Sequence, residues 1–181
     1  MLRRDCCDSA VVCTDLEELA ALHAINDTIE YAANDMKTGT SAGGMLACSM
    51  LYNHKGQKMD CSKAVELFEN GGPIIFKKNG FNKLRRLVDS QYPAKNIENV
   101  LKDIFGDSKI SDAETEGLIT AYDITNREAV LFDTESAKRD KKRDYRLRDI
   151  ARATSAAPTY FPIAEIFILL SSQYFRNACI S

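Results

Sequence analysis

Histidine, glycine and proline are scarce in this chain, and tryptophan is absent. The 181 residues include two histidines, nine glycines and four prolines. The six cysteines form no C-x-x-C pair and have no metal-ligand spacing with the histidines, so a metal centre is not expected. Reduced thiols in an intracellular setting are the simplest interpretation of this cysteine pattern.

Long apolar stretches are also missing. The apolar run at 166–170 is far shorter than the roughly 20 residues that a membrane-spanning helix needs. The basic start Met1–Arg4 has no apolar region behind it, so no secretory signal peptide is predicted. We therefore expect a protein without a transmembrane segment, either cytoplasmic or exported without a recognisable signal peptide.

Composition and charge are those of an ordinary globular protein. The hydrophobic fraction is 45%, and neither repeats nor low-complexity linkers interrupt the sequence. A net charge of −2 gives no indication of nucleic-acid binding. We expect one domain over residues 1–181.

The first glycines in the chain are concentrated in one short segment. Gly39-Thr40-Ser41-Ala42-Gly43, followed by Gly44, fits the G-x-S-x-G pattern of a nucleophile elbow, a sharp turn between a strand and a helix. Glycines permit the backbone conformations and close approaches that such a turn requires. The turn would present the Ser41 hydroxyl and direct the Ala42 N–H at a developing oxyanion. A tight strand–helix turn without any catalytic role fits the same residues.

The two histidines limit the kind of serine hydrolase that this chain can be. An α/β-hydrolase triad runs Ser…Asp…His along the chain. His54 is the only histidine after Ser41, and no histidine follows a suitable acid. If Ser41 is a nucleophile, its base is another group, and a carboxylate is the natural candidate.

A second motif identifies a family. Residues 151–162, with the sequence ARATSAAPTYFP, closely resemble the A-R-A-T-S-A-A-P-x-Y-F segment of patatin-like phospholipases. Residues 39–44 resemble that family's G-T-S-[AT]-G-G elbow, and residues 118–124 and 130–132 its central strand pair. The resemblance covers about 36–162, while 1–35 and 163–181 are divergent.

The resemblance carries expectations about fold and activity. It implies a three-layer α/β/α sandwich and a Ser-Asp dyad, with Ser41 as nucleophile and the elbow residues Gly39, Ala42, Gly43 and Gly44 around it. The implied reaction is hydrolysis of acyl esters of phospholipids and related lipids, as part of lipid metabolism and without a cofactor.

Two motifs of the family have no counterpart in this sequence. The glycine-rich loop D-G-G-G-x-R-G should precede the elbow, but the first glycine here is Gly39. The catalytic aspartate should lie in a downstream D-G-[GA] motif, but the last glycine is Gly117 and no Asp-Gly pair exists. The pattern is that of a truncated or frame-disrupted member of the family, in which we expect impaired catalysis. The alternative is a non-catalytic remnant that binds lipid or a protein.

Periodicity and turn residues predict the layout of the matched region. Apolar residues from 97 to 105 predict a helix, and residues 63–70 predict a short helix that Gly71-Gly72-Pro73 ends. Strands are expected at 118–124 and 129–133, and a further helix begins near Leu147. Together, residues from about 38 to 162 should form a mixed sheet with helices on both faces.

Basic residues cluster between Lys138 and Arg148. A lipid-acting enzyme could use them for peripheral contact with an anionic membrane. Interspersed aspartates favour the alternative of a solvated loop before the helix. Loss of strands beside the matched region would leave open sheet edges, so self-association is a further expectation.

Overall fold

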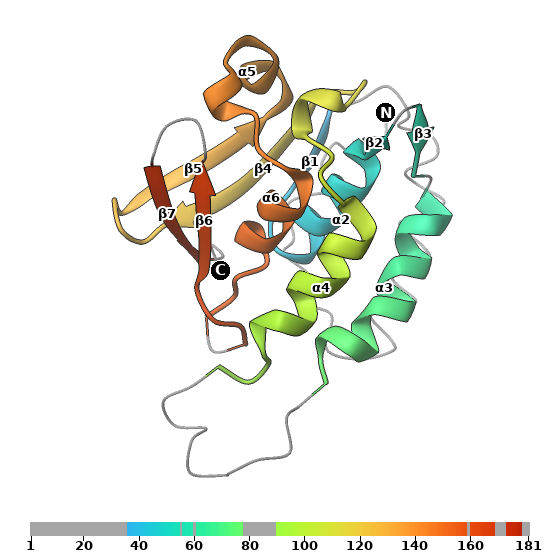
Figure 1. The fold of residues 1–181 in the computed structure, drawn as a ribbon, viewed down its shortest axis with the longest axis vertical. Coiled ribbons are helices and arrows are strands. Elements are labelled where there is room, and N and C mark those ends of the chain that lie inside the picture. Colours follow the sequence, from blue (N-terminus) through green and yellow to red (C-terminus); the bar gives the residue numbers. More distant parts are fainter. Residues whose placement is uncertain are drawn as a thin grey trace, which may run out of the picture.

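The computed structural model describes residues 36–54, 56–59, 61–77, 90–158, 160–168 and 173–178. These residues form a mixed sheet and a layer of helices (Figure 1). The predicted α/β class is therefore confirmed. His23, the other of the two histidines, lies outside the described residues.

The central strand of the sheet is β4 (Gly117–Asp123), and both of its edges are occupied. Along one edge runs β5 (Glu128–Asp133), antiparallel, from Leu118↔Asp133 to Asp123↔Glu128. Two strands share the other edge of β4, one after the other along its length. Strand β1 (Lys37–Gly39) pairs there in parallel, and β7 (Gln173–Ala178) pairs antiparallel further along β4. Strand β6 (Ala164–Ile168) extends the sheet beyond β7.

The β4–β5 hairpin confirms the strands predicted at 118–124 and 129–133. Asp123 is fully buried, and its carboxylate accepts bonds from the backbone N–H groups of Thr125 (2.8 Å) and Asn126 (3.4 Å). The side-chain amide of Asn126 adds a third bond at 2.7 Å. Arg127 completes the turn with a φ of 59°. This carboxylate is thus used to cap the turn.

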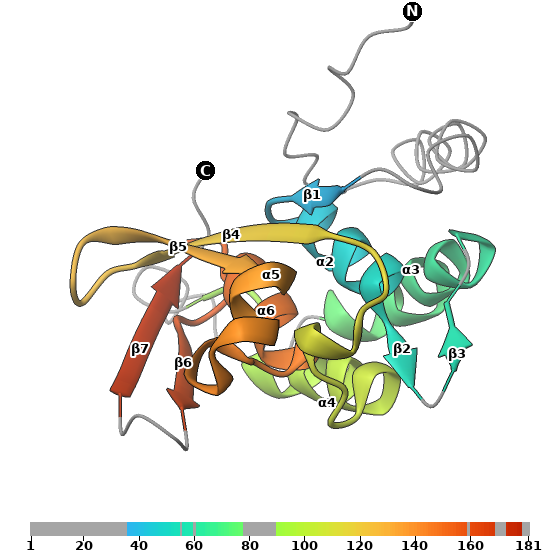
Figure 2. The same cartoon turned by 90° about the horizontal axis from the view of Figure 1, so that it is seen from above.

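Alternate residues of β4 point to two different environments. Ile119, Ala121 and Asp123 are buried, whereas Leu118, Thr120 and Tyr122 are only half-buried. Figure 2 shows helices α2, α4, α5 and α6 on one side of β4 and β5, which explains the buried set. The second helical face that the sequence predicts is not formed by these helices, and it stays a prediction.

The helical layer is built around α4 (Ala94–Phe105). Its buried residues Ile97, Val100, Leu101 and Phe105 repeat at helical spacing, as predicted. Helix α6 (Leu147–Thr154) lies between α4 and the sheet, and α2 (Ala42–Leu51) packs against both α6 and β4. Shorter elements complete the described fold: β2 (Asn53–His54), β3 (Gln57–Lys58), η3 (Ile110–Asp112), α5 (Thr134–Arg139) and η4 (Lys141–Arg143).

The predicted end of the helix at Gly71 is wrong. Helix α3 (Cys61–Ile75) continues through Gly71, Gly72 and Pro73. Gly71 is buried where α3 approaches Val100 of α4, so the small residue serves close helix packing. Tertiary packing here outweighs the low helix propensity of the Gly-Gly-Pro sequence.

Arg152 ties α6 to its neighbours from inside the fold. The residue is 6% exposed, and its guanidinium contacts Glu98 of α4 at 3.3 Å and donates to the Pro162 carbonyl at 2.7 Å. Burial lowers the pKa of Arg152, and the nearby Glu98 carboxylate opposes that effect. Arg152 belongs to residues 151–155, here called the ARATS motif. Its contacts hold α6 and the segment that leads to β6 in place.

Candidate active site

Ser41 lies at the turn between β1 and α2, as the elbow pattern predicts. Its backbone has φ 56° and ψ −125°, a combination that residues with a Cβ rarely adopt. Such a conformation costs on the order of 1–3 kcal/mol and persists only where the surroundings enforce it. The serine residue is 6% exposed, so little of it reaches solvent.

Two glycines make room for this turn. A Cβ on Gly39 would lie 2.4 Å from the Gly43 carbonyl oxygen, so the strand end and the first turn of α2 could not come this close. A Cβ on Gly44 would lie 2.6 Å from Thr154 Oγ1. The glycine spacing of the elbow therefore reflects two separate close approaches.

Hydroxyl groups from two other elements hold the turn. The Ser41 N–H donates to Thr154 Oγ1 at 2.8 Å, and both residues are buried. The hydroxyl groups of Thr40 and Thr120 are hydrogen-bonded to each other, which connects the turn to β4. The ARATS motif and the elbow, more than 100 residues apart in sequence, thus meet at one hydrogen bond.

The helix that follows Ser41 supplies backbone donors. Ala42, Gly43 and Gly44 are the first residues of α2, and N–H groups in a first helical turn have no partner within the helix. The positive end of the helix dipole lies at the same place. This geometry suits an oxyanion beside Ser41, with Ala42 N–H as the nearest donor along the chain.

Asp123 and Asp149 are alternatives to the missing catalytic aspartate, but neither lies beside Ser41. Asp123 is three residues beyond Thr120 along β4, roughly 10 Å at the usual strand rise. Asp149 is five residues before Thr154, on another face of α6, and contacts Arg148 at 3.8 Å. Burial raises the pKa of Asp149, and the adjacent Arg148 and Arg146 oppose that effect.

His54 is also too far away to act as the base. It follows α2, whose ten residues rise about 15 Å from the elbow. In the part of the chain that the structure describes, no hydrogen bond joins the Ser41 hydroxyl to a carboxylate or an imidazole. The described residues therefore contain the serine, its turn and its helix, without a partner base.

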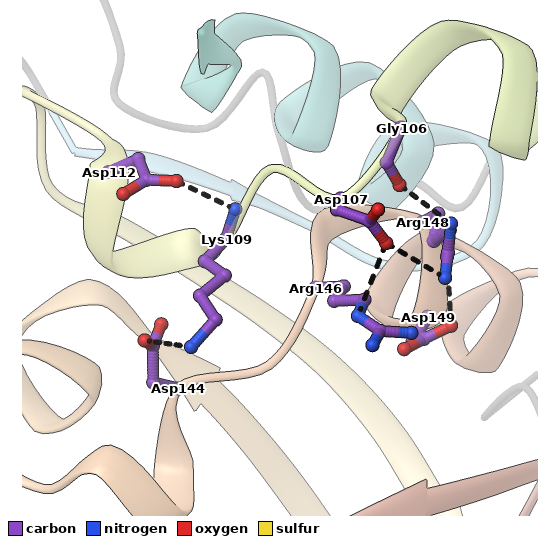
Figure 3. A network of polar contacts seen from close by, with 8 residues as sticks. All are labelled: Gly106, Asp107, Lys109, Asp112, Asp144, Arg146, Arg148 and Asp149. Carbon is purple, nitrogen blue, oxygen red and sulfur yellow. Dashed lines mark hydrogen bonds and ion pairs between the residues drawn. The ribbon is translucent and has the colours of Figure 1, made fainter. Parts of the chain in front are cut away.

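Three residues of the basic run, Arg139, Arg146 and Arg148, are engaged in ion pairs. Figure 3 shows Arg146 and Arg148 converging on Asp107, at 3.5 Å and 3.1 Å. Lys109 contacts Asp144 at 3.0 Å in the same network. These contacts join the loop after α4 to the start of α6, and they favour the structural alternative for this part of the run.

Aromatic side chains gather at one end of the helical layer, here called the aromatic end. Tyr92, just before α4, has ring centroids 5.2 Å from Phe76, 5.7 Å from Phe161 and 6.4 Å from Tyr160. Phe76 itself is 38% exposed. These ring contacts join the end of α3, the segment before α4 and the segment after α6.

Sequence reasoning located Ser41 and its glycines, but it missed Thr154 and the Thr40–Thr120 pair. The sequence of the ARATS motif does not indicate that Thr154 accepts a hydrogen bond from the Ser41 N–H. A hydroxyl among alanines in a buried helix end was the available signal. The neighbouring Ser155 has a structural contact instead, since its hydroxyl donates to the Arg152 carbonyl at 3.2 Å.

Among the residues that the structure describes, no group of three or more histidine, cysteine, aspartate or glutamate side chains could hold a metal ion. No helix of the described ranges is long and apolar enough to cross a bilayer.

The sequence is similar to those of known proteins. The family model "Patatin-like phospholipase" matches residues 18–174, a longer stretch than the 36–162 over which the motifs carry the resemblance. The chain is 31% identical over 130 residues to "Probable inactive patatin-3-Kuras 1" of Solanum tuberosum, covering 71% of this chain and 34% of that protein. To Patatin-17 of Solanum cardiophyllum it is 28% identical over 130 residues, covering 71% of this chain and 32% of that protein.

The chain thus spans about a third of the length of these curated relatives. The elbow, the ARATS motif that contacts it and the match of the family model all agree: the chain belongs to the patatin-like phospholipase family, a family of lipid acyl hydrolases.

Proposed function

We propose that this chain carries the nucleophile portion of a patatin-like acyl-ester hydrolase site, with Ser41 as nucleophile and Ala42 N–H as an oxyanion donor. The observation that supports the proposal is the strained backbone of Ser41 at the start of α2, with φ 56° and ψ −125°. A conformation of this kind is kept at functional sites, where the surrounding structure enforces it. Gly39 and Gly44 make room for the same turn, and Gly43 lies in the first turn of α2.

The substrate class that follows is an acyl ester of a phospholipid or related lipid. The Ser41 hydroxyl would attack the ester carbonyl, its proton would pass to a base, and the carbonyl oxygen would become the oxyanion. In the family's dyad that base is an aspartate. No carboxylate of the described residues is hydrogen-bonded to the Ser41 hydroxyl, so the base is the part that the proposal lacks.

We further propose that the chain alone hydrolyses esters poorly. General-base assistance contributes about 10²–10⁴-fold, and one oxyanion donor about 10²–10³-fold. The absence of the D-G-[GA] and D-G-G-G motifs removes both contributions. The name of one relative, "Probable inactive patatin-3-Kuras 1", is in line with loss of activity in this family.

The experiment is to assay the purified chain and its Ser41→Ala variant on a short-chain aryl ester and on a phospholipid. Equal rates near background are expected. A robust rate that disappears in Ser41→Ala would instead show that the dyad is completed by residues not identified above. Labelling with a fluorophosphonate, which reports on serine nucleophilicity with fluoride as leaving group, separates a weak nucleophile from an inert one.

A second function, lipid binding without catalysis, is favoured by exposed apolar side chains at the aromatic end. Ile74 (53% exposed) and Ile163 (49%) are each two residues along the chain from a ring of the cluster, Phe76 and Phe161 respectively. Exposed apolar residues grouped beside aromatic rings are typical of contact with a lipid interface. Lys77 and Lys95, both exposed, add positive charge at this end.

Vesicle co-sedimentation tests this second function. We expect Ile74→Ser combined with Ile163→Ser to weaken binding to phosphatidylcholine vesicles that contain phosphatidylserine. Leu131→Ser is the matched control, because Leu131 is equally exposed (48%) but lies on β5. Equal binding by all three proteins would contradict lipid contact at the aromatic end.

A further inference from the structure

Thr154 is the one residue of the ARATS motif whose side chain bonds to the elbow. It is the last residue of α6 and is fully buried. Its Oγ1 accepts the Ser41 N–H at 2.8 Å. The contact lies on the backbone of the proposed nucleophile itself.

The local packing is arranged so that this hydroxyl can reach Ser41. A Cβ at Gly44 would lie 2.6 Å from Thr154 Oγ1 and 2.7 Å from its Cγ2. Any side chain at position 44 would therefore push Thr154 away from the turn. The third glycine of the elbow and the threonine of the distant motif thus depend on each other.

The bond acts on the least favourable backbone conformation of the site. At positive φ the peptide N–H of Ser41 points toward α6, and a return to negative φ would turn that N–H away from Thr154. A buried N–H without an acceptor costs about 1–3 kcal/mol. The Thr154 hydroxyl therefore opposes relaxation of the strained conformation.

We propose that Thr154 is a positioning residue, whose hydroxyl holds Ser41 in the elbow conformation and so orients both the Ser41 side chain and the following Ala42 N–H. The proposal rests on the proposed function in one respect, that Ser41 is the nucleophile. The hydrogen bond and its effect on the backbone stand apart from reactivity.

Two substitutions distinguish positioning from simple core packing. Thr154→Val keeps the shape and removes the acceptor, whereas Thr154→Ser keeps the acceptor and removes a methyl group. A packing role predicts that valine is tolerated and serine is harmful. A positioning role predicts that serine at this position is tolerated, and that valine disturbs the conformation of Ser41.

The primary measurement is amide hydrogen exchange of Ser41 by NMR in the full chain. We expect slow exchange in the parent and in Thr154→Ser, and exchange at least about tenfold faster in Thr154→Val. The amides of Ile119 and Ala121 in β4 serve as the folding reference, with rates unchanged. Equal Ser41 exchange in Thr154→Val and the parent would overturn the proposal.

The proposal stays falsifiable if the valine variant does not fold. An unprotected Ser41 amide in the parent chain would contradict the hydrogen bond directly. Loss of more than about tenfold of protection in a folded Thr154→Ser would do the same, because that variant retains the acceptor.

Fluorophosphonate labelling then separates this proposal from the proposed function. We expect labelling of the parent and of Thr154→Ser at similar rates, at least about tenfold slower labelling of Thr154→Val, and none of Ser41→Ala. If the parent is not labelled while exchange follows the expected order, the positioning role holds and nucleophilicity of Ser41 fails. Fast labelling of a folded Thr154→Val, at the parent's rate, would overturn the positioning role.

Discussion

The strained backbone of Ser41 depends on neighbouring glycines, which have no Cβ atom. At Gly39 a Cβ would meet the Gly43 carbonyl oxygen, a backbone atom that cannot move without displacing α2. A Cβ on Gly43, in contrast, would meet nothing within 4 Å. Two glycines of one motif are therefore expected to respond in opposite ways to the same substitution.

We predict that Gly39→Ala lowers the free energy of unfolding by about 1–3 kcal/mol, the usual cost of overpacking. Gly43→Ala is the matched control. It should be neutral or raise that free energy by up to about 1 kcal/mol, since alanine favours helix and restricts the unfolded chain. Urea denaturation of both variants measures the difference. Similar destabilisation by both would contradict the close approach at Gly39.

Asp149 gives a prediction about pH. Burial raises its pKa above the ordinary value of 3.8, although Arg148 and Arg146 oppose the shift. The fold then binds the proton more tightly than the unfolded chain does. This contribution to stability is therefore complete below about pH 3.8 and is lost as the pH rises through the folded-state pKa.

The uncharged variant Asp149→Asn should consequently be more stable than the parent at pH 7, by an increment that shrinks as the pH falls toward 4. Urea midpoints across this pH range provide the measurement. Asp103→Asn, an exposed change on α4, should show no comparable trend. A parent that is the more stable protein at pH 7 would mean that the arginine contacts outweigh burial.

At the scale of elements, regular periodicity was a reliable guide and chain-breaking residues were not. The spacing of Ile97, Val100 and Leu101 located α4, and the turn at 125–127 separated β4 from β5. The Gly-Gly-Pro sequence at 71–73 misled, because the packing of α3 on α4 is invisible in the local sequence. The Ser41–Thr154 contact was unpredictable for the same reason: two elements distant in sequence create it.

Pro73 is expected to reduce the stability of α3. Within the helix it cannot donate to the carbonyl of Glu69, and proline in a helix interior costs about 3 kcal/mol. We predict that Pro73→Ala stabilises the chain by about 1–2 kcal/mol, after the loss of proline's restriction of the unfolded state. Pro73→Gly should gain about 1 kcal/mol less than alanine. Thermal or urea unfolding would show this order, and a destabilised alanine variant would contradict it.

At the scale of the molecule, the sheet has one covered face and one that the described helices leave open. Thr38 and Leu131 are exposed on that side, and Tyr122 is half-buried. The sequence predicted the mixed sheet and its central hairpin. The strands that would flank this part in a longer relative cannot be inferred from a chain that spans about a third of those relatives.

The open face and the strand edges together give the prediction of self-association. In the described part of the chain, β5 pairs only with β4 and β6 only with β7, so each presents an unpaired edge. Leu131 adds a large apolar side chain, 48% exposed, on β5. An edge with this character tends to pair with a second chain or to aggregate.

We predict that the purified chain associates in a concentration-dependent manner and that Leu131→Lys shifts it toward monomer, since an edge lysine must lose its hydration to be covered by a partner. Sedimentation velocity over a range of concentrations measures both effects. Ile163→Lys is the matched control, equally exposed (49%) but outside the strands. A parent that stays monomeric at all concentrations and unfolds in one sharp transition would show that the open face and edges are adequately protected.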